Sequence, residues 1–164
     1  MTEPYRESLQ RGCRGLGSKL QTSATPCASG DDLVMKIIPK RPTTKAPSDH
    51  FVGDAWIDRI AEAEPPSWIR VSVVRFAPGA RNAWHAHAVG QTLHVTEGIG
   101  RVQSRGGEIV EIRAGDTIST PPGEWHWHGA APDHFMTHLA MWEGSIEGPE
   151  PEWGDQVSDE EYGA

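Results

Sequence analysis

The chain has 164 residues, the size of one domain with its own core, and its 18 glycines and 13 prolines are typical of a turn-rich fold. Its net charge of −8 is uneven: residues 1–47 carry eight basic and four acidic side chains, whereas residues 48–164 carry seven and 19. Residues 48–164 are acidic enough to repel the phosphate backbone of a nucleic acid, so we expect no nucleic-acid partner. No apolar run approaches the length of a membrane span or a secretion signal, and the only cysteines are Cys13 and Cys27. We therefore expect a cytoplasmic protein with no membrane partner.

The N-terminal segment predicts no regular structure. Residues 1–34 show no sustained hydrophobic period and are rich in Gly, Ser and Thr, so we expect them to be disordered. Met35 opens "MKIIPKRPTTKAP", which looks like a natural beginning, so translation of residues 1–34 is itself open. "PKRPTTKAP" is a linker-like stretch that cannot be a central strand. Residues 1–47 are thus predicted to be a leader and linker.

From Phe51 the pattern changes to that of a sheet. Short β-branched or alternating runs are separated by turn residues, in "FVGDAWIDRI", "SWIRVSVVRFAP", "QTLHVTEGIG", "RVQSRGGEIVEI", "DTISTPPG", "EWHWHGA" and "HFMTHLAMWE". The third run is expected to end at its glycines, and the fourth carries a Gly-Gly hairpin turn. Many short strands without a convincing amphipathic helix predict an all-β antiparallel barrel or sandwich over residues 48–148. Residues 149–164 form an acidic tail in which "VSDEEY" is expected to make a short helix.

Two histidines in this sheet-like region lie one residue apart. His85 and His87 fall on the same face of a strand because side chains alternate there, and Gln91 follows four residues later. The spacing therefore suggests a pair of ligands aimed at one point. The alternative is that these are ordinary barrel-lining residues satisfied by hydrogen bonds.

The spacing of these residues and of nearby glycines resembles the two signature motifs of the cupin superfamily. The first block runs from Gly79 to Gly98 and the second from Gly115 to His126, with 16 residues between them. Gln91 stands where the family usually has Glu, and Ala130, four residues after the second block, stands where the family motif often ends in Asn. The resemblance implies a single-domain cupin (a double-stranded β-helix or jelly-roll barrel) that binds one divalent metal through His85, His87, Gln91 and His126. Three imidazoles and an amide oxygen suit a divalent transition metal such as Mn, Fe, Ni or Zn. Four protein ligands leave room for water or substrate, as in a catalytic site.

Several longer runs resemble a narrower group, the bacterial manganese-dependent hydroxynitrile lyases of cupin fold. They are "PGARNAWHAH", "GQTLHVTEG", "AGDTISTPPGEWHWHGAAP", "MTHLA" and "DEEY". The resemblance implies a carbon–carbon lyase that cleaves small-molecule cyanohydrins to a carbonyl compound and cyanide, with manganese as Lewis acid. It also implies that His128 and His138 lie beside the metal. We expect His138 to be the general base, and His128 or the surroundings of Gln91 to help place cyanide. A core role bonded to the backbone is the alternative for His138.

Two positions depart from the lyases: Asn82 replaces a small hydroxyl residue, and Trp142 replaces a polar residue four positions after His138. A different substrate therefore stays open. So do two other functions, an Fe(II)-dependent dioxygenase and a non-catalytic metal-containing binding protein. Because Gln91 is neutral, a bound ion keeps its full charge, which favours Lewis-acid chemistry.

Residues that flank the motifs are expected to be structural. Trp84, Trp125 and Trp127 alternate with the ligands and should point away from the lumen, onto a second sheet or a partner subunit, so a homo-oligomer (dimer or tetramer) is expected. Arg81 is expected to bond a loop carboxylate. His94 and His134 should face away from the metal.

Overall fold

The computed structural model describes residues 35–63, 66–144 and 151–163. The chain divides into two units, residues 1–38 and 39–164. In the first unit, only residues 35–38 are described, and they are exposed and lie in neither helix nor strand. The predictions for residues 1–34 therefore lie outside the described residues. No helix in the described ranges is both long and apolar enough to cross a bilayer.

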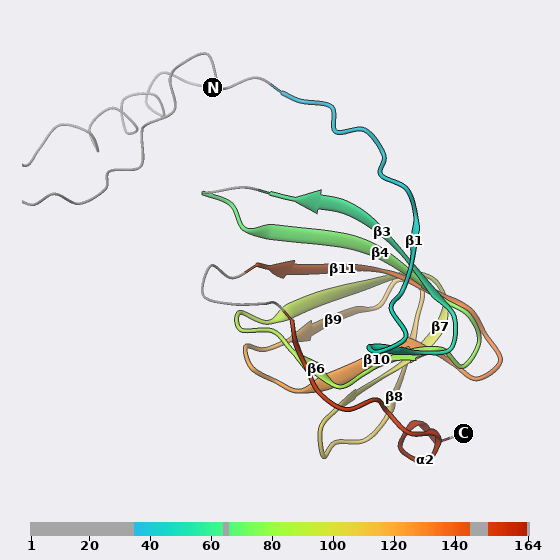
Figure 1. Cartoon of the computed structure of the whole chain (residues 1–164). Helices are drawn as coiled ribbons and strands as arrows, with labels where there is room; N and C mark the ends of the chain where they lie inside the picture. The colour runs from blue at the N-terminus through green and yellow to red at the C-terminus, as the bar shows by residue number, and fades with distance from the viewer. Residues whose placement is uncertain (1–34, 64–65, 145–150, 164) are drawn as a thin grey trace, which may run out of the picture. The chain divides into compact units, whose positions relative to one another are not determined.

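The second unit is an antiparallel β-barrel, as predicted (Figure 1). Its elements are β1 (Thr44–Lys45), β2 (Phe51–Val52), β3 (Ala55–Glu62), β4 (Ile69–Phe76), β5 (Arg81–Asn82), β6 (His85–Ala86), β7 (Gln91–Ser104), β8 (Val110–Arg113), β9 (Thr117–Thr120), β10 (His126–Ala130), β11 (Met136–Glu143), β12 (Glu152–Trp153) and α2 (Asp159–Tyr162). The segment expected to be a linker thus contains an edge strand, β1, and the acidic tail contains both β12 and the expected short helix.

Two sheets face each other across the lumen and share β7. The first has the order β1-β3-β4-β11-β7, with β9 on the far side of β7. In the second, β10 pairs with β5, β6 and the later part of β7, while β2 pairs with β5 and β12 with β6. Strand β7 is therefore the element that joins the two sheets.

The passage of β7 between sheets corrects the expectation that this strand ends at its glycines. The strand runs unbroken from Gln91 to Ser104, and its register against β11 shifts between Thr137 and His138. At Gly98 the backbone has φ of 79°, and an added Cβ would lie 1.8 Å from the Phe135 carbonyl oxygen. Glycine is needed there because the strand bends against its neighbour without room for a side chain.

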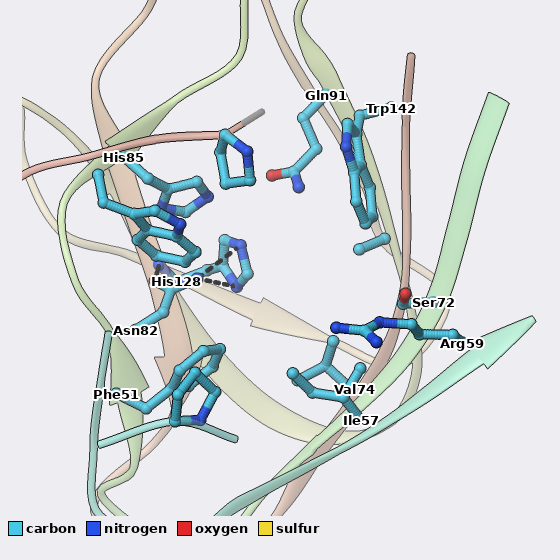
Figure 2. A pocket seen from close by; sticks show the side chains of 14 residues that line it. Phe51, Ile57, Arg59, Ser72, Val74, Asn82, His85, Gln91, His128 and Trp142 are labelled. Atoms are coloured by element: carbon cyan, nitrogen blue, oxygen red, sulfur yellow. Dashed lines mark hydrogen bonds between the residues drawn. The ribbon is translucent and has the colours of Figure 1, made fainter. Parts of the chain in front are cut away.

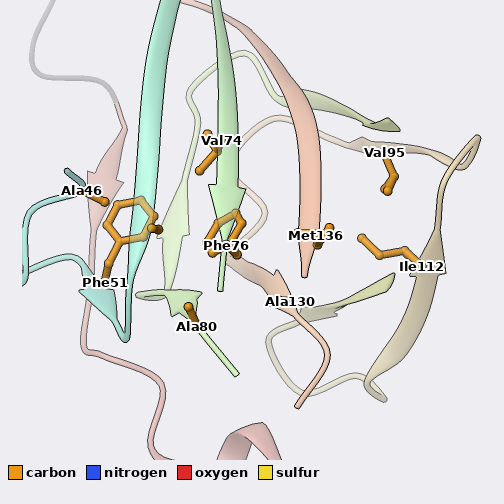
Figure 3. Close-up of a cluster of buried hydrophobic side chains, with 10 residues drawn as sticks. Ala46, Phe51, Val74, Phe76, Ala80, Val95, Ile112, Ala130 and Met136 are labelled. Carbon is orange, nitrogen blue, oxygen red and sulfur yellow. The ribbon is translucent and has the colours of Figure 1, made fainter. Parts of the chain in front are cut away.

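The hydrophobic core lies between the strands of the barrel (Figure 3). Phe76, Val95 and Met136 are fully buried there and come from β4, β7 and β11 of the first sheet. Phe51 from β2 covers them from the second sheet, with its ring 6.0 Å from that of Phe76. The cavity of the candidate site adjoins this core, because Phe51 and Val74 belong to both, and its polar side chains include Asn82, His85 and His128.

A second apolar cluster lies on the outer face of β10. Trp84 and Trp127 point away from the lumen, as alternation predicts, and pack against Val157 and Tyr162. The cover is thus the C-terminal segment (residues 151–163) of the same chain, in place of the second sheet or partner subunit that the sequence allowed. Arg81 donates hydrogen bonds to the Val157 carbonyl and to the Asp159 carboxylate at 2.7 Å, which confirms its expected acidic partner.

Candidate metal centre

The predicted ligands come from three elements that meet at the open end of the lumen. His85 lies on β6 and pairs directly with His126 on β10, while Gln91 begins β7. His87 follows β6. All four side chains are buried, with at most 6% of any residue exposed. Because β6 and β10 are adjacent and antiparallel, residues paired across them carry side chains on the same face.

The ring and amide groups of this cluster lie within contact of one another. The Nε2 atom of His126 is 2.9 Å from Oε1 of Gln91, and the His85 and His126 rings are 4.2 Å apart between centroids. The His87 ring lies 5.4 Å from that of His85 and 6.1 Å from that of His126. One nitrogen from each of His85, His126 and His128 falls within a 4.8 Å span that could hold a metal ion. Among the described residues this group includes His128, which the sequence placed beside the metal, and does not include the predicted ligand His87.

Backbone carbonyls set the tautomers of two of these histidines. Nδ1 of His85 donates to the Ala83 carbonyl at 3.0 Å, and Nδ1 of His126 donates to the Glu124 carbonyl at 2.9 Å. Each neutral ring therefore keeps its Nε2 lone pair free to face the cluster, which is how metal-binding histidines are oriented. Nε2 of His126 and Oε1 of Gln91 are then two acceptors facing each other, an arrangement that a shared cation stabilises.

Burial keeps these imidazoles neutral. It lowers the pKa of His85 well below its usual value, helped by the neighbouring His126 and His87. Burial, then His126, lowers the pKa of His87 to about 3, and burial also lowers the pKa of His126. Metal binding requires neutral imidazole, so the protonation state and the donor set both fit a divalent transition metal.

A second histidine pair adjoins the cluster. Nδ1 of His128 lies 3.1 Å from Nε2 of His138, and the Asn82 side chain holds His128 from the other side. Oδ1 of Asn82 accepts the His128 backbone N–H at 2.9 Å, and Nδ2 of the same amide lies 3.0 Å from Nε2 and 3.3 Å from Nδ1 of His128. The tautomer with its proton on Nδ1 lets His128 donate to Nε2 of His138 and accept from Asn82 at Nε2.

Both members of this pair are neutral and deeply buried. Burial lowers the pKa of His128 well below its usual value and lowers that of His138 to about 4. Among the described residues, Nδ1 of His138 has no hydrogen-bond partner. The ring of His138 packs on Phe76 at 5.6 Å, on the side of His128 away from the cavity. His138 is thus a buried core residue whose ring is also bonded to His128.

A cavity of about 200 Å³ opens beside the cluster (Figure 2). Asn82, His85 and His128 form one wall, from β5, β6 and β10. The opposite wall comes from the first sheet and consists of Ile57, Arg59, Ser72, Val74, Gln91, Ala140 and Trp142. His138 is not part of the lining, and His94 bonds Thr117 on the opposite face of β7.

The structure also adds cavity residues that sequence reasoning missed. Arg59 and Ser72 are register partners on β3 and β4, and both face the lumen in the same row as Ala140. Strand alternation from Val74 and Ile57 could have placed them, because residues two apart share a face. The two departures from the lyase pattern, Asn82 and Trp142, both line the cavity.

The fold is a small β-barrel, and the site in its lumen is a cluster of histidines of the kind that binds a metal ion. The family model for the cupin domain matches residues 72–141. A curated relative, (R)-mandelonitrile lyase from Granulicella tundricola, is 44% identical over 78% of this chain and 97% of its own length. The chain belongs to the cupin family.

Solved structures agree with this assignment. A cupin-like protein from Thermotoga maritima is 37% identical, with a TM-score of 0.69 over 78% of this chain and 95% of its own. A cupin 2 conserved barrel domain protein from Rhodopseudomonas palustris is 17% identical and has a TM-score of 0.57 over 68% of this chain and 76% of its own. The second likeness concerns the fold alone.

Proposed function

We propose that this protein is a metal-dependent lyase that cleaves a cyanohydrin into a carbonyl compound and cyanide. The observation that carries the proposal is the cluster of neutral histidines and Gln91 that opens onto a small-molecule cavity, in a chain 44% identical to (R)-mandelonitrile lyase. The cavity volume of about 200 Å³ equals that of roughly seven water molecules, which suits a small substrate.

His85, His87, Gln91 and His126 would hold the metal. The donors are nitrogen and amide oxygen without a carboxylate, and we propose manganese, with Fe, Zn or Ni as alternatives. When bound, the ion supplies Lewis-acid chemistry at full charge. His128 is close enough to join the set, but its two ring nitrogens already face Asn82 and His138, and we assign it to the substrate side.

The histidine pair would move the proton. The bond between the carbinol and nitrile carbons breaks with its electron pair leaving on cyanide, and the carbon–oxygen bond becomes a carbonyl. His128 faces the cavity, and the substrate hydroxyl replaces the Asn82 amide at its Nε2. His128 then takes the hydroxyl proton at Nε2, while its Nδ1 proton passes to Nε2 of His138. We therefore assign His138 as the general base acting through His128. The pair returns the proton to cyanide, so the products are a carbonyl compound and HCN.

The test is mandelonitrile cleavage by manganese-loaded protein without oxygen, followed as benzaldehyde absorbance. We expect His126→Ala to lose both metal and activity, and His138→Gln to keep the metal, measured by elemental analysis, but lose most of the rate. His94→Gln is the matched control, because His94 bonds Thr117 away from the lumen. A metal-loaded protein that leaves both mandelonitrile and the cyanohydrin of para-formylbenzoate intact, or that needs oxygen for turnover, overturns the proposal. Oxygen consumption with Fe(II) would instead support the dioxygenase.

We further propose a cytoplasmic homo-oligomer, a dimer or tetramer. The cytoplasmic assignment rests on cysteine usage. The two cysteines, Cys13 and Cys27, lie outside residues 48–164, so the barrel lacks the disulfide framework that is typical of small secreted domains. Exposed Trp56 and Ile60 on β3 supply apolar contact area for a second copy. Light scattering on the purified chain tests this, and a monomer at micromolar concentration contradicts it.

A further inference from the structure

Arg59 brings a positive charge into the cavity wall. It lies on β3 opposite Ser72 of β4, two residues after Ile57, so its side chain leaves the sheet on the lumen side. Figure 2 shows its guanidinium reaching into the cavity from the wall opposite His128 and Asn82. The side chain is 59% exposed, which puts it at the mouth, where a bound molecule would meet it first.

The guanidinium is available for a ligand. Its only ionic neighbour among the described residues is Glu62, whose Oε1 lies 3.7 Å from Nε. That carboxylate is already hydrogen-bonded by Arg41. Within the described ranges the two terminal amino groups of Arg59 therefore make no hydrogen bond. Arginine presents such groups as a planar fork that matches a carboxylate.

No negative charge in the cavity wall balances Arg59. The side chains around it are apolar, or are neutral polar groups such as Ser72, Asn82, Gln91 and the two lining histidines. Arg59 is the one charged side chain among the described lining residues. A divalent ion held by neutral ligands would add further positive charge, so the cavity favours an anionic occupant.

We propose that the natural substrate carries a carboxylate at the end remote from its hydroxyl, and that Arg59 binds this carboxylate. The inference rests on the proposed function and deepens it, because it names the class of cyanohydrin: those of carbonyl compounds that bear a carboxylate. The hydroxyl end lies at the histidine wall, and the carboxylate lies across the cavity at its mouth.

Binding tests the inference without turnover. In calorimetry on the metal-loaded protein, we expect para-(hydroxymethyl)benzoate to bind about tenfold more tightly than the neutral para-(hydroxymethyl)benzamide. Arg59→Gln should abolish this preference, and Arg59→Lys should keep part of it because the charge remains. Arg75→Gln is the control, since Arg75 pairs with Asp58 on the face of the sheet away from the cavity. A preference that persists in Arg59→Gln overturns the inference.

Kinetics separate this inference from the proposed function. The kcat/KM for the cyanohydrin of para-formylbenzoate, divided by that for the cyanohydrin of para-formylbenzamide, should exceed one. In Arg59→Gln this ratio should fall about tenfold because KM for the carboxylate substrate rises. In the unchanged protein the ratio should decrease with added salt. If both cyanohydrins are cleaved at a ratio that Arg59→Gln does not change, the carboxylate site is wrong and the lyase stands. If neither is cleaved while the binding preference depends on Arg59, the lyase is wrong and the anion site stands.

Discussion

Substitutions at Tyr162 test whether the C-terminal segment stabilises the outer face of β10. Its ring is buried to 1% exposure and lies 5.6 Å from that of Trp127, between the two site residues His126 and His128. Its hydroxyl donates to the Ala130 carbonyl at 2.5 Å. The perturbations are Tyr162→Phe, which removes only the hydroxyl, and Tyr162→Ala, which removes the ring as well.

The contacts give different magnitudes for the two variants. Loss of one buried hydrogen bond should cost about 1 kcal/mol in the free energy of unfolding. Loss of the ring should cost about 3–5 kcal/mol for the cavity it leaves. The guanidinium carbons of Arg81 and Arg101 lie 4.6 Å and 5.1 Å from the ring centre, so cation–π attraction adds about 0.5–1 kcal/mol for each. Tyr162→Ala should therefore be several times more destabilising than Tyr162→Phe.

Urea unfolding followed by tryptophan fluorescence measures both effects. With a slope of about 2 kcal/mol per molar urea, the midpoint should fall by about 0.5 M in Tyr162→Phe and by about 2.5–4 M in Tyr162→Ala. We also expect Tyr162→Ala to bind manganese more weakly in chelator competition, because β10 loses its outer support. Equal midpoints for the two variants would refute the claim that the aromatic packing, beyond the hydroxyl, stabilises this face.

Three further predictions concern acid, backbone and charge. The pKa of His138 is lowered to about 4, so between pH 6.5 and 4 the unfolded chain binds a proton at this residue that the folded chain does not. The urea midpoint of the metal-free protein should therefore fall as the pH is lowered through this range, and the fall should be smaller in His138→Gln. Gly98→Ala should abolish folding or lower the melting temperature far more than Gly106→Ala, since both have positive φ but only Gly98 meets a backbone oxygen. Gln91→Glu should raise manganese affinity about tenfold in chelator competition while lowering kcat, and unchanged affinity would argue against Gln91 as a ligand.

Local spacing predicted the parts of the site that lie close in sequence. His126 and His128 straddle Trp127, so alternation on one strand puts the two imidazoles in the lumen and the indole outside, as observed. Placing His85 next to His126 also requires that β6 pairs with β10. No local rule predicts the pairing of residues 41 positions apart, so this contact could be expected only from the family resemblance.

The sequence alone left open what requires contacts between distant segments. An outward indole such as Trp127 packs equally well on a second sheet, on a partner or on the chain's own tail, and the pattern around it is the same in each case. Only the path of residues 151–163 decides between them. Likewise, Gly98 is typical of a turn, and its role as a bend within one long strand depends on where Phe135 lies.

The two walls of the cavity differ in how deeply their residues are buried, and we expect them to have different roles. Every residue of β10 is buried, because the lumen covers one face and Tyr162 covers the other. Groups that move protons and hold an ion need such fixed positions. Arg59 instead lies on β3, whose only partners are β4 and the two-residue β1, and its side chain is half exposed. A change there alters which molecule is bound without disturbing the histidines. Substrate choice is therefore expected to depend on β3 and β4, and the reaction itself on β6, β10 and the start of β7.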